Sequence, residues 1–132
     1  MREDEIPETL FDALGGALGV RALVDRFYAL MDTLPEAEAI RAMHPADLGE
    51  SADKLYEFLS GWTGGPPLYI QKRGHPRLRA RHMPFAIGSD AASAWMRCMS
   101  QALDEVVPEP MLRQRVAESL TRVAQHMQNR PT

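Results

Sequence analysis

Residues 73–85 read RGHPRLRARHMPF and decide how the rest of the chain is interpreted, because they combine two of its four histidines with four arginines and two prolines. Pro76 can begin a helix, since the first helical position needs no backbone N–H donor. Pro84 is expected to end it, since the residue before a proline is pushed out of helical geometry. The sequence therefore predicts one or two helical turns between the two prolines.

One face of this short helix is apolar except for a histidine. Leu78 and His82 are four residues apart and Phe85 follows three later, a spacing that puts all three on one side of a helix. A neutral imidazole on an apolar face can serve as a metal ligand. It can equally be a histidine at a helix end that bonds to a backbone carbonyl, and these residues alone leave both interpretations open.

Further helices are predicted on both sides of this segment. Those before it cover residues 7–14, about 17–33, 36–43 and, from helix-start signals at 47–51, up to about 62. Residues 68–74 are expected to be a connector. After it, Ser89 and Asp90 are expected to cap a helix that runs to about 107, and a last helix begins at about 111. No strand-like alternation and no internal repeat occurs, so the predicted fold class is all-α.

Each long helix carries apolar residues at three- and four-residue spacing, the pattern of a helix with one buried face. The stripes are Val20, Leu23, Val24, Phe27 and Met31; Leu55, Phe58, Leu59 and Trp62; Ala91, Trp95, Cys98, Met99, Ala102 and Val106; and Leu112, Val116, Leu120, Val123 and Met127. These stripes predict the helix faces that form the core.

The bulk composition is that of one globular domain over residues 1–132, with residues 1–8 expected to be a flexible N-terminal extension. A net charge of −3 disfavours nucleic acid or an anionic membrane as the main partner. No apolar run approaches the roughly 20 residues that span a bilayer. The acidic N-terminus lacks a signal-peptide core, and the single cysteine, Cys98, fits a reducing compartment, so we expect a cytoplasmic protein.

Two other kinds of site are disfavoured. A zinc site is weakly supported, because His75 and His82 are seven residues apart and no cysteine pair or His-Glu-x-x-His sequence accompanies them. Nucleophilic catalysis is equally weakly supported, because Cys98 lies in an apolar stripe, where a buried and inert thiol is expected.

The segment RGHPRLRARHMPF resembles the proximal segment of the group II truncated haemoglobins, and the likeness extends from Leu10 to Asn129. The resemblance implies an abbreviated globin fold, a two-over-two helical sandwich around one haem b. It also implies that His82, and not His75, is the axial ligand of the haem iron. The glycine pairs at 15–16 and 64–65 would cap helices and permit the tight bends of this fold.

The resemblance also implies a polar distal pocket. Tyr28 and Trp95 match the two hydrogen-bond donors that the family directs at a ligand on the iron, and Ser51 and Leu55 match the nearest positions of the distal helix. His44 occupies a position at which members of the family differ. It is either a third donor over the ligand or an exposed loop residue before a proline.

Two further groups of residues are implied to contact the haem itself. The propionates would be held by charged or hydroxyl side chains, although the alternative for each charged one is a solvated surface charge. The proposed propionate partners are Lys54, Tyr69 and Arg81, and the proposed apolar walls are Phe58, Leu78 and Phe85.

Three classes of function follow from these observations. The first is binding of oxygen and other small ligands, such as NO, CO, cyanide or peroxide, with slow oxygen release because of the polar pocket. The second is a redox enzyme, a nitric oxide dioxygenase or a peroxidase, that needs an external reductase. The third is a helical interaction module without a cofactor. The oligomeric state stays open, with a homodimer among the options.

Overall fold

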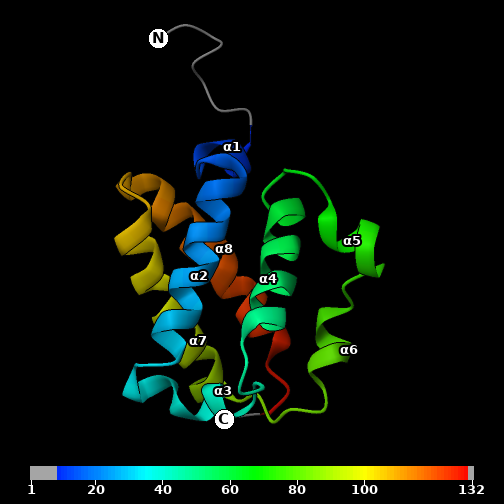
Figure 1. The fold of residues 1–132 in the computed structure, drawn as a ribbon. Coiled ribbons are helices and arrows are strands. Elements are labelled where there is room, and N and C mark those ends of the chain that lie inside the picture. The colour runs from blue at the N-terminus through cyan, green and yellow to red at the C-terminus, as the bar shows by residue number, and fades with distance from the viewer. Residues whose placement is uncertain (1–8, 131–132) are drawn as a thin grey trace, which may run out of the picture.

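The computed structural model describes residues 9–130, apart from the side chain of Arg79, so the expected extension at 1–8 lies outside the described residues. Within this range the chain forms only helices (Figure 1), which confirms the all-helical prediction. In order they are α1 (Leu10–Ala13), α2 (Gly16–Met31), the 3-10 helix η2 (Pro35–Ala37), α3 (Glu38–Ala42), α4 (Gly49–Trp62), α5 (Leu68–Arg73), α6 (Leu78–His82), α7 (Ser89–Val106) and α8 (Pro110–Met127).

The four long helices form the body of the molecule. In Figure 1, α2 and α4 run side by side with α8 behind them, and α7 packs against both α2 and α8. The stripe predicted on α2 faces this body, and none of its five side chains is more than 1% exposed: Val20, Leu23, Val24, Phe27 and Met31. Burying such side chains contributes about 1.5–3 kcal/mol each, so α2 is the central element of the core.

The segment predicted to be a connector, residues 68–74, is mostly helical, and that prediction was wrong. Leu68–Arg73 forms α5, which begins directly after Pro67 and ends at Gly74 with a positive φ of 84°. A helix of six residues is not stable by itself in water. It forms here because it packs on α4, where the carboxylate of Glu57 accepts a 2.6 Å hydrogen bond from Nε of Arg73.

The start of α6 was also predicted wrongly. The helix begins at Leu78 and not at Pro76, because Arg77 adopts a left-handed conformation with φ 46° and ψ 51°. A left-handed residue cannot continue a right-handed helix. Phe85 consequently lies beyond the end of α6 at His82 and does not share its last turn.

The predicted side-chain cap of α7 is absent. Gly88 occupies the N-cap position, and no side chain bonds to the first free N–H groups of the helix.

The two glycine pairs do mark helix junctions, for two different reasons. Gly15 and Gly16 have positive φ values of 100° and 69°, which glycine adopts without a steric penalty, and they turn the chain from α1 into α2. Gly64 is similar, with φ 95°, whereas Gly65 is required for space, because a Cβ there would overlap the ring of Phe11. The bend between α4 and α5 therefore depends on α1 as well.

Candidate functional site

A cavity of about 530 Å³ opens among the helices, within the size range of small-molecule and cofactor sites. Its wall includes all twelve residues that the resemblance assigned to the haem site, contributed by α2, α4, α5, α6, α7 and the loops beside them. They are Tyr28, His44, Ser51, Lys54, Leu55, Phe58, Tyr69, Leu78, Arg81, His82, Phe85 and Trp95. The structure thus brings together side chains that are up to 67 positions apart in the chain.

The imidazole of His82 is held at the last residue of α6. Its Nδ1 lies 2.6 Å from the carbonyl oxygen of Leu78, one turn earlier on the same helix. A carbonyl only accepts, so Nδ1 carries the proton and the lone pair of neutral His82 is on Nε2. A histidine whose Nδ1–H is fixed in this way is oriented to bind a metal through its other nitrogen.

The second histidine of the segment is placed differently. His75 is exposed and lies outside the cavity wall, and its Nδ1 accepts a 3.1 Å hydrogen bond from the backbone N–H of Arg77. This bond belongs to the turn that puts Arg77 in its left-handed conformation. His75 therefore has a local role in the chain turn before α6.

Tyr28 and Trp95 reach the cavity from α2 and α7, and one buried ring lies between them. The ring of Phe27 meets Tyr28 edge-on at a centroid distance of 4.9 Å and meets the tilted ring of Trp95 at the same distance. Burial raises the pKa of Tyr28 well above its ordinary range, so its hydroxyl stays protonated and can donate. The sequence pattern predicts Phe27 only as a core residue, yet its ring contacts both Tyr28 and Trp95.

His44 lies in the loop after α3, where it is half-buried and lines the cavity. Its Nδ1 lies 2.7 Å from the carbonyl oxygen of Ile40, and its ring meets Tyr28 edge-on at 5.9 Å. As at His82, the carbonyl fixes the neutral tautomer with the proton on Nδ1. The Nε2 of neutral His44 is therefore an acceptor and becomes a donor only when the ring takes up a second proton.

Charged groups gather at the rim of the cavity. Nζ of Lys54 pairs with the carboxylate of Glu50 at 3.2 Å. Arg81 is exposed, and within residues 9–130 no carboxylate pairs with its guanidinium. Tyr69 is buried, with the guanidinium of Arg73 6.0 Å from the centre of its ring.

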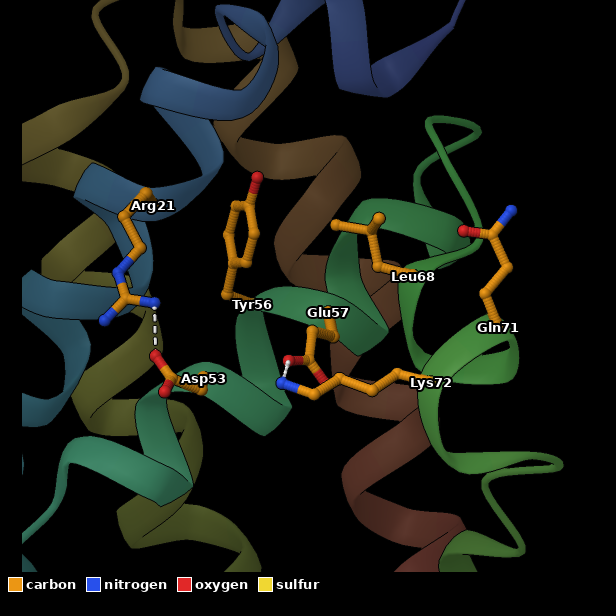
Figure 2. A pocket seen from close by; sticks show the side chains of 7 residues that line it. All are labelled: Arg21, Asp53, Tyr56, Glu57, Leu68, Gln71 and Lys72. Atoms are coloured by element: carbon orange, nitrogen blue, oxygen red, sulfur yellow. Dashed lines mark hydrogen bonds and ion pairs between the residues drawn. The ribbon is translucent and has the colours of Figure 1, made fainter.

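A second, open pocket of about 420 Å³ lies on the outer side of α4, between α2 and α5 (Figure 2). Figure 2 shows Arg21 turned toward Asp53, at 2.8 Å, and Lys72 turned toward Glu57, at 3.3 Å. The guanidinium of Arg21 also lies 5.6 Å from the centre of the Tyr56 ring. The charges of this pocket are satisfied by one another, and they tie α2, α4 and α5 together.

Comparison with known proteins agrees with this architecture and cavity. The bacterial-like globin family matches residues 9–129. The group II two-on-two haemoglobin of Agrobacterium tumefaciens is 49% identical, with a TM-score of 0.89 over 93% of this chain and 95% of its own. The chain belongs to the group II truncated haemoglobins.

Two other members extend the comparison. The group 2 truncated haemoglobin YjbI of Bacillus subtilis strain 168 is 41% identical over 119 residues, which are 90% of this chain and 87% of that protein. A solved structure described as a truncated oxygen-avid haemoglobin from Bacillus subtilis is 39% identical, with a TM-score of 0.85 over 92% of this chain and all of its own. The two-over-two globin architecture expected from the sequence is thereby confirmed.

Membership of this family implies a haem cofactor and diatomic gas ligands. The residues present fit such a group. An imidazole with its Nδ1 already hydrogen-bonded lines a largely apolar cavity, and the cations Lys54 and Arg81 lie at its rim.

No helix in the described part of the chain is long and apolar enough to cross a membrane. Among residues 9–130, no three His, Cys, Asp or Glu side chains come together as a metal site.

Several wall residues were not foreseen from the sequence. The last turns of α8 and the helix α3 contribute side chains that their apolar pattern assigned to the core or to no site at all. These are Leu120, Val123, Ala124 and Met127 on α8, and Ile40 on α3. A residue facing a cofactor cavity and a residue facing a packed core have the same helical spacing, so no pattern in a single sequence distinguishes them.

Cys98 is fully buried, as predicted, and burial raises the pKa of its thiol.

Proposed function

We propose that this haemoglobin holds one haem b in the larger cavity, with His82 as the axial ligand, and binds oxygen and other small diatomic molecules with slow release. The single observation that supports this most is the content of the cavity wall: an imidazole with a fixed Nδ1 from α6, together with the donors Tyr28 and Trp95 from α2 and α7. A donor-rich wall favours a protein that retains its ligand over one that delivers it.

The residues of the chain act by donating hydrogen bonds. When bound, haem iron supplies the position at which a diatomic gas coordinates, and distal donors adjust how tightly it is held. A hydrogen bond to a charged acceptor contributes about 1.5–3 kcal/mol, and about 1.4 kcal/mol corresponds to a factor of ten. Two donors would therefore slow the loss of a ligand that carries partial negative charge by roughly 100-fold or more. The description of the Bacillus subtilis structure as oxygen-avid agrees with this expectation.

The other proposed contacts follow from side-chain chemistry. Ser51 and Leu55 of α4 line the ligand space, and Phe58, Leu78 and Phe85 provide apolar walls for the macrocycle. In the neutral ring of His44 the only N–H donates to the carbonyl oxygen of Ile40. We therefore propose His44 as a third donor that acts when its ring is charged.

Lys54, Tyr69 and Arg81 are proposed to hold the propionates. The guanidinium of Arg81 can bind both oxygens of one carboxylate. Lys54 would exchange its contact with the Glu50 carboxylate for a propionate, because a propionate is also a carboxylate with one negative charge.

The test compares the two histidines of the decisive segment. In a titration of apoprotein with haemin followed by the Soret band, His82→Ala is expected to bind haem at least tenfold more weakly, because the only imidazole in the wall near α6 is lost. His75→Ala serves as the matched control. His75 lies seven residues away, and among the described residues its ring bonds only to the backbone N–H of Arg77. The haem affinity and ferrous spectrum of this variant are expected to match those of the wild type.

The result that would overturn the assignment is equal loss of haem in both variants, or loss in the His75 variant alone.

A further inference from the structure

The loop between α6 and α7, residues 83–88, is bonded to the C-terminal end of the chain by Asn129 and by the backbone of Arg130. Asn129 lies two residues beyond α8, which in Figure 1 comes down beside this loop. Its Nδ2 donates to the carbonyl oxygen of His82 at 3.2 Å and to that of Phe85 at 2.9 Å. Its Oδ1 accepts from the backbone N–H of Ile87 at 2.9 Å. The backbone N–H of Asn129 donates to the carbonyl oxygen of Ile87 at 2.8 Å.

The other bonds to this segment come from backbone groups: the N–H of Arg130 donates to the carbonyl oxygen of Ile87 at 3.1 Å, and the N–H of Phe85 donates to the carbonyl oxygen of His82 at 3.0 Å. Met83 and Phe85 are 49% and 39% exposed, and Pro84 has no N–H to donate. The helix before it, α6, is five residues long and packs mainly on α8. A helix this short is not stable without tertiary contacts. The position of His82 at its end therefore depends on what holds the following residues.

The carboxamide of asparagine suits this task because it has both a donor and an acceptor on a short stem. Its NH₂ group bonds to the carbonyls of His82 and Phe85, and its oxygen bonds to the backbone N–H of Ile87, so the end of α6 and two backbone groups of the loop are held at once. Aspartate has the same shape but no donor, and alanine has neither group. The two substitutions thus remove different parts of the same contact.

We propose that Asn129 is the positioning residue for His82: it fixes the backbone carbonyl of that residue while Leu78 fixes its ring, and together they set the direction of Nε2 into the cavity. The proposal rests on the proposed function of His82 as the axial ligand. Two separate anchors are needed because the Leu78 contact fixes the ring only relative to α6, whereas Asn129 ties the end of α6 to α8.

The experiment uses four variants of the full-length chain: Asn129→Ala, Asn129→Asp, His82→Ala, and Gln125→Ala as a control. Gln125 is an exposed carboxamide four residues earlier, on α8 itself.

The first measurement is amide hydrogen exchange of residues 82–88 in the apoprotein, which needs no haem. In Asn129→Ala the amide of Ile87 loses its acceptor, and its exchange is expected to be roughly three- to tenfold faster, the change that loss of one net hydrogen bond produces. In Asn129→Asp that acceptor remains, so the Ile87 amide should change less.

The second measurement is the iron–histidine stretching band in the resonance Raman spectrum of the ferrous, haem-loaded protein. Both Asn129 variants lose the donor to the His82 carbonyl, so both should shift and broaden this band, while Gln125→Ala should leave it in place. A general loss of stability would also speed exchange at the Ile87 amide. A band that shifts in Asn129→Asp while that amide changes little therefore points to the contact with His82 and not to lost stability.

The outcomes separate the two proposals. If His82→Ala abolishes the band and both Asn129 variants leave the band and the loop exchange as in the wild type, the positioning role is wrong and the ligand assignment stands. If His82→Ala keeps the band, the ligand assignment fails, and the role of Asn129 fails with it.

Discussion

At the scale of single residues, Tyr28 and Trp95 reach the cavity from helices that lie far apart in the sequence, and Phe27 touches both rings. Tyr28 is buried between the rings of Phe27 and His44, whereas Trp95 is half-buried and meets the ring of Phe27, so packing restricts both rings. The protonated state of Tyr28 is equally fixed, since burial raises its pKa. The two side chains proposed as donors are therefore restricted by the packing of the protein itself.

This arrangement predicts that the donors are energetically coupled. In stopped-flow measurements of oxygen release from the haem-loaded protein, Tyr28→Phe and Trp95→Phe are each expected to speed release by roughly tenfold or more, from loss of one hydrogen bond. The double variant should differ from the product of the single effects by an interaction energy of about 0.5–3 kcal/mol, because both donors share Phe27 and one small ligand.

Tyr56→Phe is the matched control for this cycle. Tyr56 is a tyrosine of α4 that lines the outer pocket and not the larger cavity, so its substitution should leave the release rate unchanged. Strictly multiplicative rates in the double variant would show that the two donors act independently.

Single residues were predictable where the relevant partner is close in sequence. A histidine at a helix end was expected to bond to a backbone carbonyl, and the structure has the ring of His82 2.6 Å from the carbonyl oxygen of Leu78. The contact of Asn129 with His82 joins residues 47 positions apart and has no counterpart in any local pattern. The same holds for Phe27, whose role depends on where α7 places Trp95.

At the scale of secondary-structure elements, α5 shows how a short helix comes to form against its sequence pattern. Residues 68–74 lack an apolar stripe. The only signs of a helix are the two prolines that precede the segment and the glycine that ends it. Glu57 of α4 provides the missing stabilisation: its side chain is only 10% exposed and binds Arg73 at 2.6 Å and Lys72 at 3.3 Å. The helix depends on this carboxylate, which lies 11 to 16 positions away.

The ion pair makes the attachment of α5 sensitive to acid. The hydrogen bond from Arg73 holds the pKa of Glu57 below its usual range. The unfolded state therefore takes up this proton at a higher pH than the folded state, and stability rises with pH across that interval. The contribution is complete above the ordinary glutamate pKa of about 4.3 and is lost as pH falls through the lower value of the folded state.

Glu57→Gln is accordingly expected to lower Tm by a few degrees at pH 7, because it removes the charge and keeps the shape. Thermal unfolding at pH 7 and at several values below pH 4 should show the difference from wild type shrinking as the wild-type carboxyl takes up its proton. Glu118→Gln is the control, since Glu118 is exposed on α8 and its loss should change little at either pH. A difference between wild type and Glu57→Gln that does not depend on pH would contradict this account.

At the scale of the whole molecule, the helical stripes predicted which faces turn inward but not what they enclose. On α7, Cys98, Met99 and Ala102 are buried in the core, whereas Trp95 of the same stripe lines the cavity. On α8 the stripe divides in the same way, with Val116 in the core and Met127 at the cavity. The all-helical fold was thus predictable from spacing, but the division between core and cavity requires the packing of all the helices.

That division predicts a strong dependence of stability on the cofactor. The wall of the 530 Å³ cavity draws on every helix from α2 to α8 except the 3-10 turn, so a haem in it would contact the folded chain at many places that the unfolded chain cannot reproduce. A ligand that binds only the folded state at a thousand times its Kd contributes about 4 kcal/mol. For a chain of 132 residues this corresponds to a difference in Tm of roughly 10–20 °C between the haem-loaded and the apoprotein. His82→Ala should reduce this difference in Tm, while His75→Ala should leave it unchanged. Coincident unfolding curves with and without haem, measured by circular dichroism, would mean that the cavity binds no such group.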